Sequence, residues 1–135
     1  MENLYLFLME DRIKTFKNWP FSDKEKCNVK NMAEAGFYSV ATGDEDADAA
    51  KCFLCGKELD GWEANDDPWA EHKSHASQCA FVQLGKKEND LLLSEFLSVV
   101  QQYMINEASK RQPEAAKQQI DEKFKAIRRR IMGLK

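Results

Sequence analysis

The chain has 135 residues, of which 43% are hydrophobic and 32% are charged, and its formal net charge is −3. This length suits one domain of ordinary size plus an extension, and the hydrophobic content is enough for a modest core, which argues against disorder throughout the chain. The apolar run at residues 4–9 (LYLFLM) is too short for a membrane span and lacks the basic start of a signal peptide, so we expect a soluble, intracellular protein.

Two segments of opposite charge stand out along the chain. Residues 40–71 contain ten acids and two lysines, a net charge of −8, whereas residues 101–135 contain nine basic residues and four acids, a net charge of +5. The first segment should attract cations, and the second should attract anions or acidic partners. Two solvated faces of opposite sign would give the same pattern.

The first predicted elements are two helices. Apolar residues at helical spacing predict a helix over residues 9–19, which Pro20 ends. The segment NMAEAG is typical of a short helix that begins at Asn31 and ends at Gly36.

Strands and a third helix are predicted around the cysteines. Asp66, Asp67 and Pro68 form a helix-start pattern, with acids before a proline in the first turn, so we expect a helix to about Ser77. The strands are expected at residues 37–40, 52–55 and 59–62, and the small, acidic residues 41–50 predict a mobile turn.

The C-terminal part changes character after about residue 90. Pro113 lies between two apolar seams, and a proline inside a helix removes a hydrogen bond, so a kink or a break is predicted near residues 111–112. Each seam spans only two heptads, too few to establish a coiled coil. Their members are Leu93, Phe96, Val100 and Tyr103 in the first and Ile120, Phe124, Ile127, Ile131 and Leu134 in the second.

Three cysteines and two histidines have the spacing of a metal site. Cys52 and Cys55 form a knuckle for tetrahedral zinc, Cys79 supplies a third thiolate, and a histidine must be the fourth ligand. In a straight helix His75 would lie about 6 Å from residue 79 along the axis and His72 about 10.5 Å, so spacing favours His75 without excluding His72. Four protein ligands leave no position for water, so we expect structural zinc.

The remaining residues give no indication of catalysis. Cys27 has no partner at a useful spacing and is interpreted as a small, half-buried residue. The sequence contains neither a phosphate-binding glycine loop nor a nucleophile pattern near a histidine, so an enzyme is not expected.

Two longer segments resemble a known family. MAEAGFYSV and CFLCGKELDGWEANDDPWAEHKSHASQCAF are similar to the baculovirus inhibitor-of-apoptosis repeat (BIR), and RIKTFKNWP is similar to its opening helix, so that the resemblance covers about residues 9–84. It implies an α+β zinc domain at residues 1–89, with a short three-stranded antiparallel sheet and surrounding helices. A long C-terminal helix would follow over residues 90–135, with a kink near Pro113 left open. The resemblance assigns one structural Zn²⁺ to His72 in place of His75, and to Cys52, Cys55 and Cys79, which requires the preceding helix to end before residue 79.

BIR domains bind the free N-terminus of a partner that begins with alanine. The resemblance therefore implies a peptide site in which carboxylates bind the ammonium group, an apolar wall contacts the alanine methyl and the peptide follows a strand edge. Asp67 is instead interpreted as a helix cap, and a core position for Trp62 and a capping role for Asp66 are the alternatives. The implied peptide-binding residues are Leu59, Asp60, Trp62 and Asp66.

A single repeat with a helical tail and an acidic insertion resembles one branch of this family. That branch reads a histone tail that begins with alanine and carries a phosphothreonine two residues later, with Lys57 and His75 as the implied phosphate contacts. A solvent-facing helix position is the alternative for His75. In the tail, the implied dimer surface consists of Leu91, Leu93 and Phe96, and the implied partner-helix surface consists of Ile120, Phe124, Ile127 and Ile131.

The resemblance implies a non-enzymatic adaptor of the chromosomal passenger complex. Its partners would be a histone tail, a borealin-like subunit, an inner-centromere-like subunit and, indirectly, a mitotic kinase. It would act in chromosome segregation and cytokinesis, in the nucleus, at centromeres, at the spindle midzone and in the cytoplasm. An inhibitor of apoptosis that binds alanine-starting peptides or caspases is the alternative function, and packing of the tail on its own repeat is the alternative for the seam. The net charge of −8 over residues 40–71 argues against a protein that binds nucleic acid, because phosphate binding needs a basic face.

Overall fold

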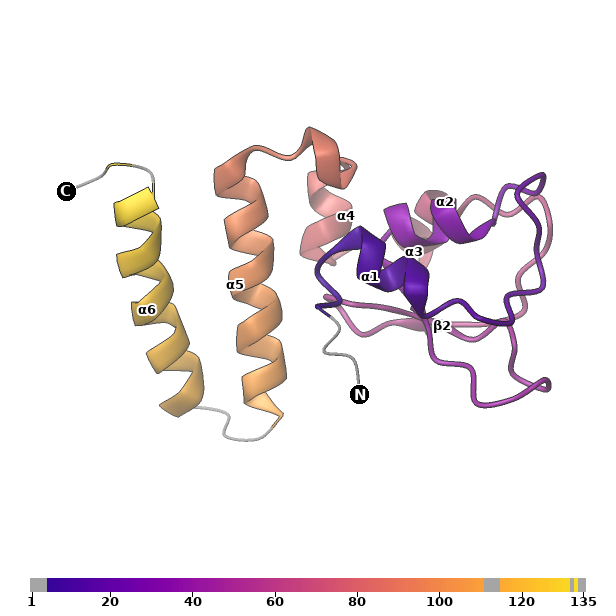
Figure 1. The fold of residues 1–135 in the computed structure, drawn as a ribbon, viewed down its shortest axis with the longest axis horizontal. Coiled ribbons are helices and arrows are strands. Elements are labelled where there is room, and N and C mark those ends of the chain that lie inside the picture. The colour runs from indigo at the N-terminus through magenta and orange to yellow at the C-terminus, as the bar shows by residue number, and fades with distance from the viewer. Residues whose placement is uncertain (1–4, 111–114, 132, 134–135) are drawn as a thin grey trace. The chain divides into compact units, whose positions relative to one another are not determined.

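The computed structural model describes residues 5–110, 115–131 and 133, and the chain divides into two compact units, Met1–Asp90 and Leu91–Lys135 (Figure 1). Within the described residues, no helix is both long and apolar enough to cross a membrane. The elements in chain order are α1 (Met9–Lys14), α2 (Val29–Glu34), β1 (Phe37–Ser39), β2 (Ala50–Cys52), β3 (Glu58–Leu59), α3 (Pro68–His75), α4 (Ala80–Leu84), η1 (Glu88–Asp90), α5 (Leu93–Ser109) and α6 (Ala115–Ile131).

The first unit contains a three-stranded antiparallel sheet in the order β1-β2-β3. The central strand β2 pairs Cys52 with Phe37 on one side and Ala50 with Leu59 on the other. β1 lies where a strand was predicted and ends one residue earlier. β2 and β3 share only Cys52 and Leu59 with the predicted strands, and both end three residues earlier than predicted. The sheet and its surrounding helices confirm the expected α+β class.

The first helix is shorter than predicted, since α1 ends at Lys14 and not near residue 19. The Thr15 hydroxyl donates to the Arg12 carbonyl at 2.6 Å and accepts from the Ser39 amide at 2.9 Å, which ties the helix end to β1. Trp19 then follows an irregular path, and its indole Nε1 donates to the Cys27 carbonyl at 2.8 Å. Tertiary contacts, not helical periodicity, therefore place these apolar residues.

The second helix begins two residues earlier than predicted. Asn28, not Asn31, is the cap, because its side-chain oxygen accepts from the Asn31 amide at 2.8 Å. After the helix, Gly36 adopts a φ of 99°, a left-handed conformation that favours glycine. A Cβ at Gly36 would lie 3.1 Å from Phe81 Cδ2 and 3.5 Å from His72 Cε1, so this glycine also allows the close approach of two core rings.

The acidic segment predicted as a mobile turn is organised by two of its aspartates. Asp46 accepts hydrogen bonds from the Thr42 and Gly43 amides at 2.8–2.9 Å, and those bonds, chiefly the Thr42 one, lower the pKa of Asp46. Asp48 accepts from the Gly61 amide at 2.8 Å and the Trp62 amide at 3.1 Å. The acidic segment therefore holds the chain that follows β3.

A buried arginine lies in the centre of the first unit. Arg12 is 1% exposed, and it donates to the Ala33 and Leu6 carbonyls, both at 2.9 Å. Its guanidinium carbon lies 4.6 Å from the ring centroid of Phe53 and 5.7 Å from that of Phe81. Burial lowers the pKa of Arg12 to about 10, so the cation persists at neutral pH.

The second unit is a pair of helices, α5 and α6, that lie side by side (Figure 1). They run antiparallel, since Arg128 Nη2 donates to Ser98 Oγ at 3.0 Å and to Gln101 Oε1 at 3.3 Å, and Gln101 also donates to Asp121. The long helix implied by the resemblance is thus interrupted. Pro113, where the kink or break was predicted, lies outside the described residues.

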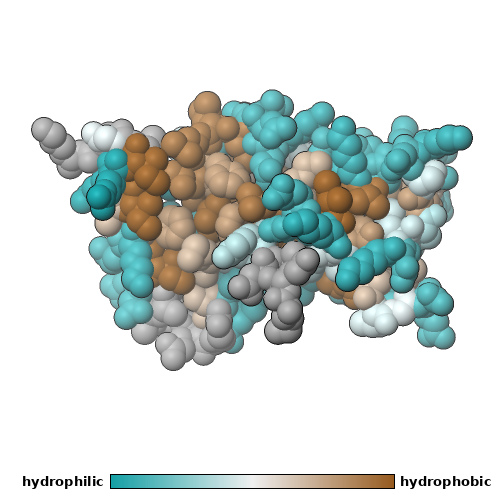
Figure 2. All heavy atoms as spheres, viewed as in Figure 1, coloured by the Kyte–Doolittle hydropathy of each residue, from teal (hydrophilic) through white to brown (hydrophobic). Residues whose placement is uncertain are grey.

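The apolar seams are only partly covered in the described residues of this unit. Figure 2 shows hydrophobic residues gathered over the two C-terminal helices. Ile120 and Phe124 are half-buried, whereas Ile127 is 46% and Ile131 54% exposed, and Leu134 lies outside the described residues. In the implied dimer surface Leu93 is exposed, and Leu91 and Phe96 are half-buried.

Gly36→Ala tests the close approach of the Phe81 and His72 rings to the backbone at Gly36. We expect this change to lower the free energy of unfolding by about 2–4 kcal/mol, because it adds backbone strain and a steric clash with a buried ring. The matched change Gly43→Ala should cost below about 0.5 kcal/mol, since a Cβ there meets nothing within 4 Å. Urea denaturation of the zinc-loaded protein measures both, and equal costs would contradict this packing.

Candidate metal centre and peptide pocket

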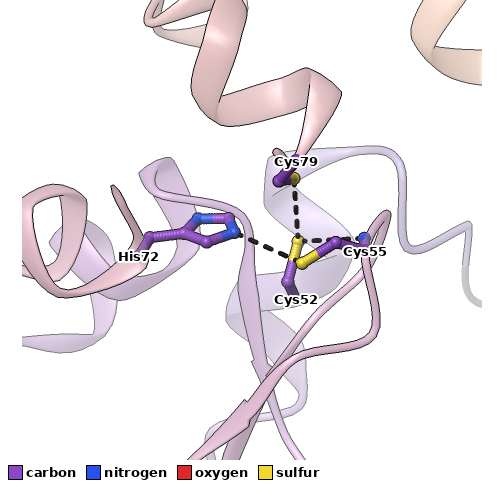
Figure 3. A group of neighbouring side chains, drawn as sticks. All are labelled: Cys52, Cys55, His72 and Cys79. Atoms are coloured by element: carbon purple, nitrogen blue, oxygen red, sulfur yellow. Dashed lines mark hydrogen bonds between the residues drawn. The ribbon is translucent and has the colours of Figure 1, made fainter. Parts of the chain in front are cut away.

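Four side chains from three segments converge in the first unit (Figure 3). Cys52 ends β2, Cys55 lies in the turn that follows, His72 belongs to α3, and Cys79 is the residue before α4. Their ligand atoms all lie within 4.8 Å of one another. Three of the four residues are buried, and Cys55 is exposed.

The distances within this cluster fit tetrahedral zinc. Zinc–sulfur bonds of about 2.3 Å and zinc–nitrogen bonds of about 2.0 Å place two sulfurs about 3.8 Å apart and a sulfur and a nitrogen about 3.5 Å apart. Here the Cys52 and Cys79 sulfurs are 3.9 Å apart, and the Cys55 sulfur is 3.6 Å from His72 Nε2. Amides of residues 54 and 55 also point at the Cys52 sulfur, at 3.3 and 3.4 Å, as in a metal knuckle. The cluster is compatible with one zinc ion, which would cross-link the three segments.

The histidine that joins the cluster is His72. Its Nδ1 lies 2.7 Å from the Ala35 carbonyl, which can only accept, so Nδ1 carries the proton and Nε2 is left for a metal. α3 ends at His75 and its cap, Ala76, leaves helical geometry, which confirms that the helix ends before Cys79. His75 lies outside the cluster, with 48% of its side chain exposed and Nε2 3.4 Å from Glu71 Oε2.

Without a metal, the cluster shares protons among its members. Burial would lower the pKa of His72, but hydrogen bonds to Cys55 and Cys79 raise it to about 9. Hydrogen bonds from Cys52, Cys55 and His72 lower the pKa of Cys79, whereas the bonds that Cys52 makes to Cys55 and Cys79 raise its own pKa. A zinc ion binds thiolates and a neutral imidazole, so metal binding at this cluster would release protons.

Cys27 is separate from this cluster. It is fully buried, not half-buried as predicted, and its thiol donates to the Glu63 carbonyl at 3.2 Å. Burial raises the pKa of Cys27 to about 11, so its reactive thiolate is scarce at neutral pH.

A pocket of about 450 Å³ is lined by residues of the segment 57–66 and of α3. Every residue assigned by the resemblance to peptide or phosphate binding lines it, together with three residues that were not assigned, Glu58, Gly61 and Glu71. The assigned residues are Lys57, Leu59, Asp60, Trp62, Asp66 and His75.

Trp62 serves both as a core residue and as a pocket wall. It is only 7% exposed, its ring centroid lies 5.4 Å from that of Phe37, and its Nε1 donates to the Leu59 carbonyl at 3.4 Å. The two interpretations of this tryptophan are therefore compatible. Asp66 is fixed at the rim, where it accepts from the Glu63 amide at 2.8 Å.

Helix α3 begins at a capping aspartate and contributes the side chains of Glu71 and His75 to the pocket. Asp67 accepts from the Trp69 amide at 3.0 Å and the Ala70 amide at 3.4 Å, which confirms its interpretation as a cap. Glu71, which sequence reasoning missed, lies one turn before His75 and faces the same pocket. The four-residue spacing of these two side chains on a predicted helix could have identified it.

Comparisons with known proteins agree with this geometry. The family described as the Inhibitor of Apoptosis domain (BIR) matches residues 12–83. The chain is 48% identical over 105 residues to Baculoviral IAP repeat-containing protein 5 of Cavia porcellus, covering 78% of this chain and 73% of that protein. It is 48% identical over 94 residues to Baculoviral IAP repeat-containing protein 5.2-A of Xenopus laevis, covering 70% of this chain and 59% of that protein. The crystal structure of the autoinhibited dIAP1-BIR1 domain is 30% identical, with a TM-score of 0.51, and the match covers 69% of this chain and 88% of that one.

Two pairs of matched variants test the metal cluster. We expect His72→Ala and Cys79→Ser to lose zinc and most of the stability of the first unit, because structural zinc supplies on the order of 10 kcal/mol. His75→Ala and Cys27→Ser should keep one zinc per chain, since neither side chain is in the cluster. Mass spectrometry of bound metal and thermal unfolding by circular dichroism, with and without chelator, measure this. Zinc loss in His75→Ala with retention in His72→Ala would reverse the assignment.

Proposed function

The chain belongs to the BIR family of inhibitor-of-apoptosis domains, and from this premise we propose that it is a non-enzymatic, survivin-like adaptor that reads a phosphorylated N-terminus. Its target would be a peptide that begins with alanine and carries a phosphothreonine two residues later, as in a histone tail. The observation that carries this proposal is that acidic side chains, an apolar wall and two basic groups line the same pocket.

The acidic part of the pocket suits a peptide N-terminus. Asp60, Asp66 and Glu71 offer carboxylates to a primary ammonium, which needs several acceptors when it leaves water. Trp62 and Leu59 offer apolar surface to the alanine methyl. Because a larger first side chain would meet this wall, the pocket should favour alanine over bulkier residues.

The basic part of the pocket suits a phosphate. Two residues of extended peptide cover about 7 Å, so a group on the third residue can reach a different part of the same pocket. Lys57 and His75 line both this pocket and a neighbouring one of about 570 Å³, and thus stand at the junction of the two. A phosphate there would bind between the ammonium and the imidazole, in competition with the Glu71 carboxylate at 3.4 Å from His75.

The C-terminal helices would connect the reader to its complex. We propose that the exposed Ile127 and Ile131 bind helices of a borealin-like and an inner-centromere-like subunit of the chromosomal passenger complex. Leu93, with Leu91 and Phe96, would form a homodimer surface in the absence of these partners. Through the two partner subunits, the chain would bring a mitotic kinase to centromeres and later to the spindle midzone, where it would act in chromosome segregation and cytokinesis. The chain would also occur in the cytoplasm.

The second candidate function is inhibition of apoptosis. The acidic end of the pocket, Asp60 with Asp66 and Glu71, can take an alanine-starting peptide that has no phosphate. Such peptides occur in pro-death proteins, and caspases are a further candidate partner. This function would make binding independent of Lys57 and His75.

A peptide titration separates the two functions. The probes are an alanine-starting histone peptide with phosphothreonine at its third residue, its unphosphorylated twin and its N-acetylated twin, followed by calorimetry. We expect the phosphate to tighten binding about tenfold, which is about 1.4 kcal/mol, and acetylation to abolish binding. His75→Ala should remove the phosphate gain and Asp66→Asn should weaken both free peptides, whereas Lys17→Ala, at an exposed position outside the pocket, should change neither.

The contrary outcomes of this titration are distinct. A phosphate gain that survives His75→Ala would reject the assigned phosphate contacts. Binding of both peptides with no phosphate gain would favour the apoptotic function. Unchanged binding in Asp66→Asn would mean that the N-terminus lies elsewhere.

The proposed dimer surface has its own test in light scattering of the full chain. We expect the lone protein to self-associate at micromolar concentration and Leu93→Asp to shift it toward monomer, because a charge there opposes apolar burial. Gln118→Asp, at an exposed polar position of α6, is the matched control and should leave the mass unchanged. A monodisperse wild-type monomer would count against an exposed binding seam.

A further inference from the structure

Helix α3 has a second exposed surface, opposite the peptide pocket. At 100° per residue, Glu71 and His75 share one face of the helix, and Trp69, Ala70 and Lys73 share the other. The second group lines a separate pocket of about 370 Å³, which Val82, Gly85 and Lys87 complete. None of these six residues lines the peptide pocket.

Trp69 forms the floor of this second surface. Its ring stacks on that of Phe81, with centroids 5.4 Å apart and an interplanar angle of 13°, and it is half-buried. Phe81 is itself 2% exposed and lies against the Arg12 guanidinium. The indole is therefore already ordered in the free protein, so little side-chain entropy of Trp69 is lost when a partner packs on it. Tryptophan is one of the residue types enriched among the side chains that contribute most at interfaces.

Two lysines give the surface its charge. Lys73 is exposed, and among the described residues its side chain has no hydrogen-bond or ion-pair partner. Lys87 Nζ lies 3.9 Å from the Glu34 carboxylate, a long contact with 62% of the lysine side chain exposed. The pocket itself has no acidic residue in its lining. This positive surface contrasts with the acidic pocket on the other side of the same helix.

We propose that the pocket formed by Trp69, Lys73, Val82 and Lys87 is a docking surface for an acidic peptide segment with an aromatic or aliphatic side chain. The apolar side chain packs on the Trp69 ring and Val82, and flanking carboxylates pair with Lys73 and Lys87. Charge complementarity identifies the occupant. The alanine-starting, phosphorylated peptide uses the other face of α3, so the two ligands can be bound together.

A single-stranded nucleic acid would also offer stacking bases and negative charge. Such ligands need a continuous basic groove along the backbone. Here Lys73 and Lys87 do not continue into such a groove, because Trp69 also lines an adjoining pocket of about 320 Å³ in which Glu34 and Asp67 accompany a single lysine, Lys26. A short peptide can place its carboxylates on Lys73 and Lys87 alone and needs no such groove. The geometry therefore favours a short acidic peptide over a nucleic acid.

The test uses the full zinc-loaded chain and a defined probe, N-acetyl-Glu-Asp-Phe-Glu-Asp-Leu-amide, whose blocked N-terminus keeps it out of the peptide pocket. The indole signal of Trp69 in proton–nitrogen NMR spectra, assigned with Trp69→Phe, reports binding. We expect this signal to shift in a saturable manner and Lys73→Glu to weaken the affinity at least about fivefold. The matched control Lys17→Glu changes an exposed lysine outside the pocket and should leave the affinity unchanged.

Further probes make each outcome decisive. A probe with glycine in place of phenylalanine and leucine should bind more weakly, because it cannot pack on the indole, and a probe with lysine in place of every acid should not shift the Trp69 signal. Equal weakening by Lys73→Glu and Lys17→Glu would show only general charge attraction and overturn the proposal. An unmoved Trp69 signal, or a larger shift with an oligothymidylate than with the acidic probe, would also overturn it.

Discussion

The four-ligand cluster is the constraint on which the first unit depends. Its strands have two or three residues and its helices five to eight, lengths at which such elements are unstable alone. Cys52 and Cys55 belong to the sheet and its turn, His72 to α3, and Cys79 to the start of α4. A zinc ion held by these four side chains would therefore supply the stability that a large apolar core gives to bigger domains.

Packing contacts connect the cluster to the side chains at the surface of the first unit. Phe81 contacts the Arg12 guanidinium on one side and the Trp69 ring on another, while Gly36 leaves room for Phe81 and His72 together. Trp62 similarly belongs to the core through Phe37 and to the peptide pocket through its remaining edge. Trp62 and Trp69, which line the two pockets, are thus fixed by the same contacts that stabilise the domain.

Much of the site could be predicted because its parts are local in sequence. The knuckle and the Asp-Asp-Pro helix start each lie within one short stretch, so their spacing indicates their chemistry. The roles of the residues from Lys57 to Asp66 were implied by the resemblance to the BIR family and not by spacing. Spacing could not select His72, because it assumes a straight helix and the chain leaves helical geometry at Ala76, before Cys79. Periodicity likewise extended α1 too far, and an apolar seam does not reveal whether a partner or α5 of the same chain covers it.

Helix α3 shows how much function a short element can carry once its ends are fixed. Asp67 and Pro68 determine where it begins, and its eight residues then present His72 to the metal, Glu71 and His75 to the peptide pocket and Trp69 with Lys73 to the opposite surface. Its two outer faces share no residue, so a substitution on one face leaves the side chains that line the other pocket unchanged.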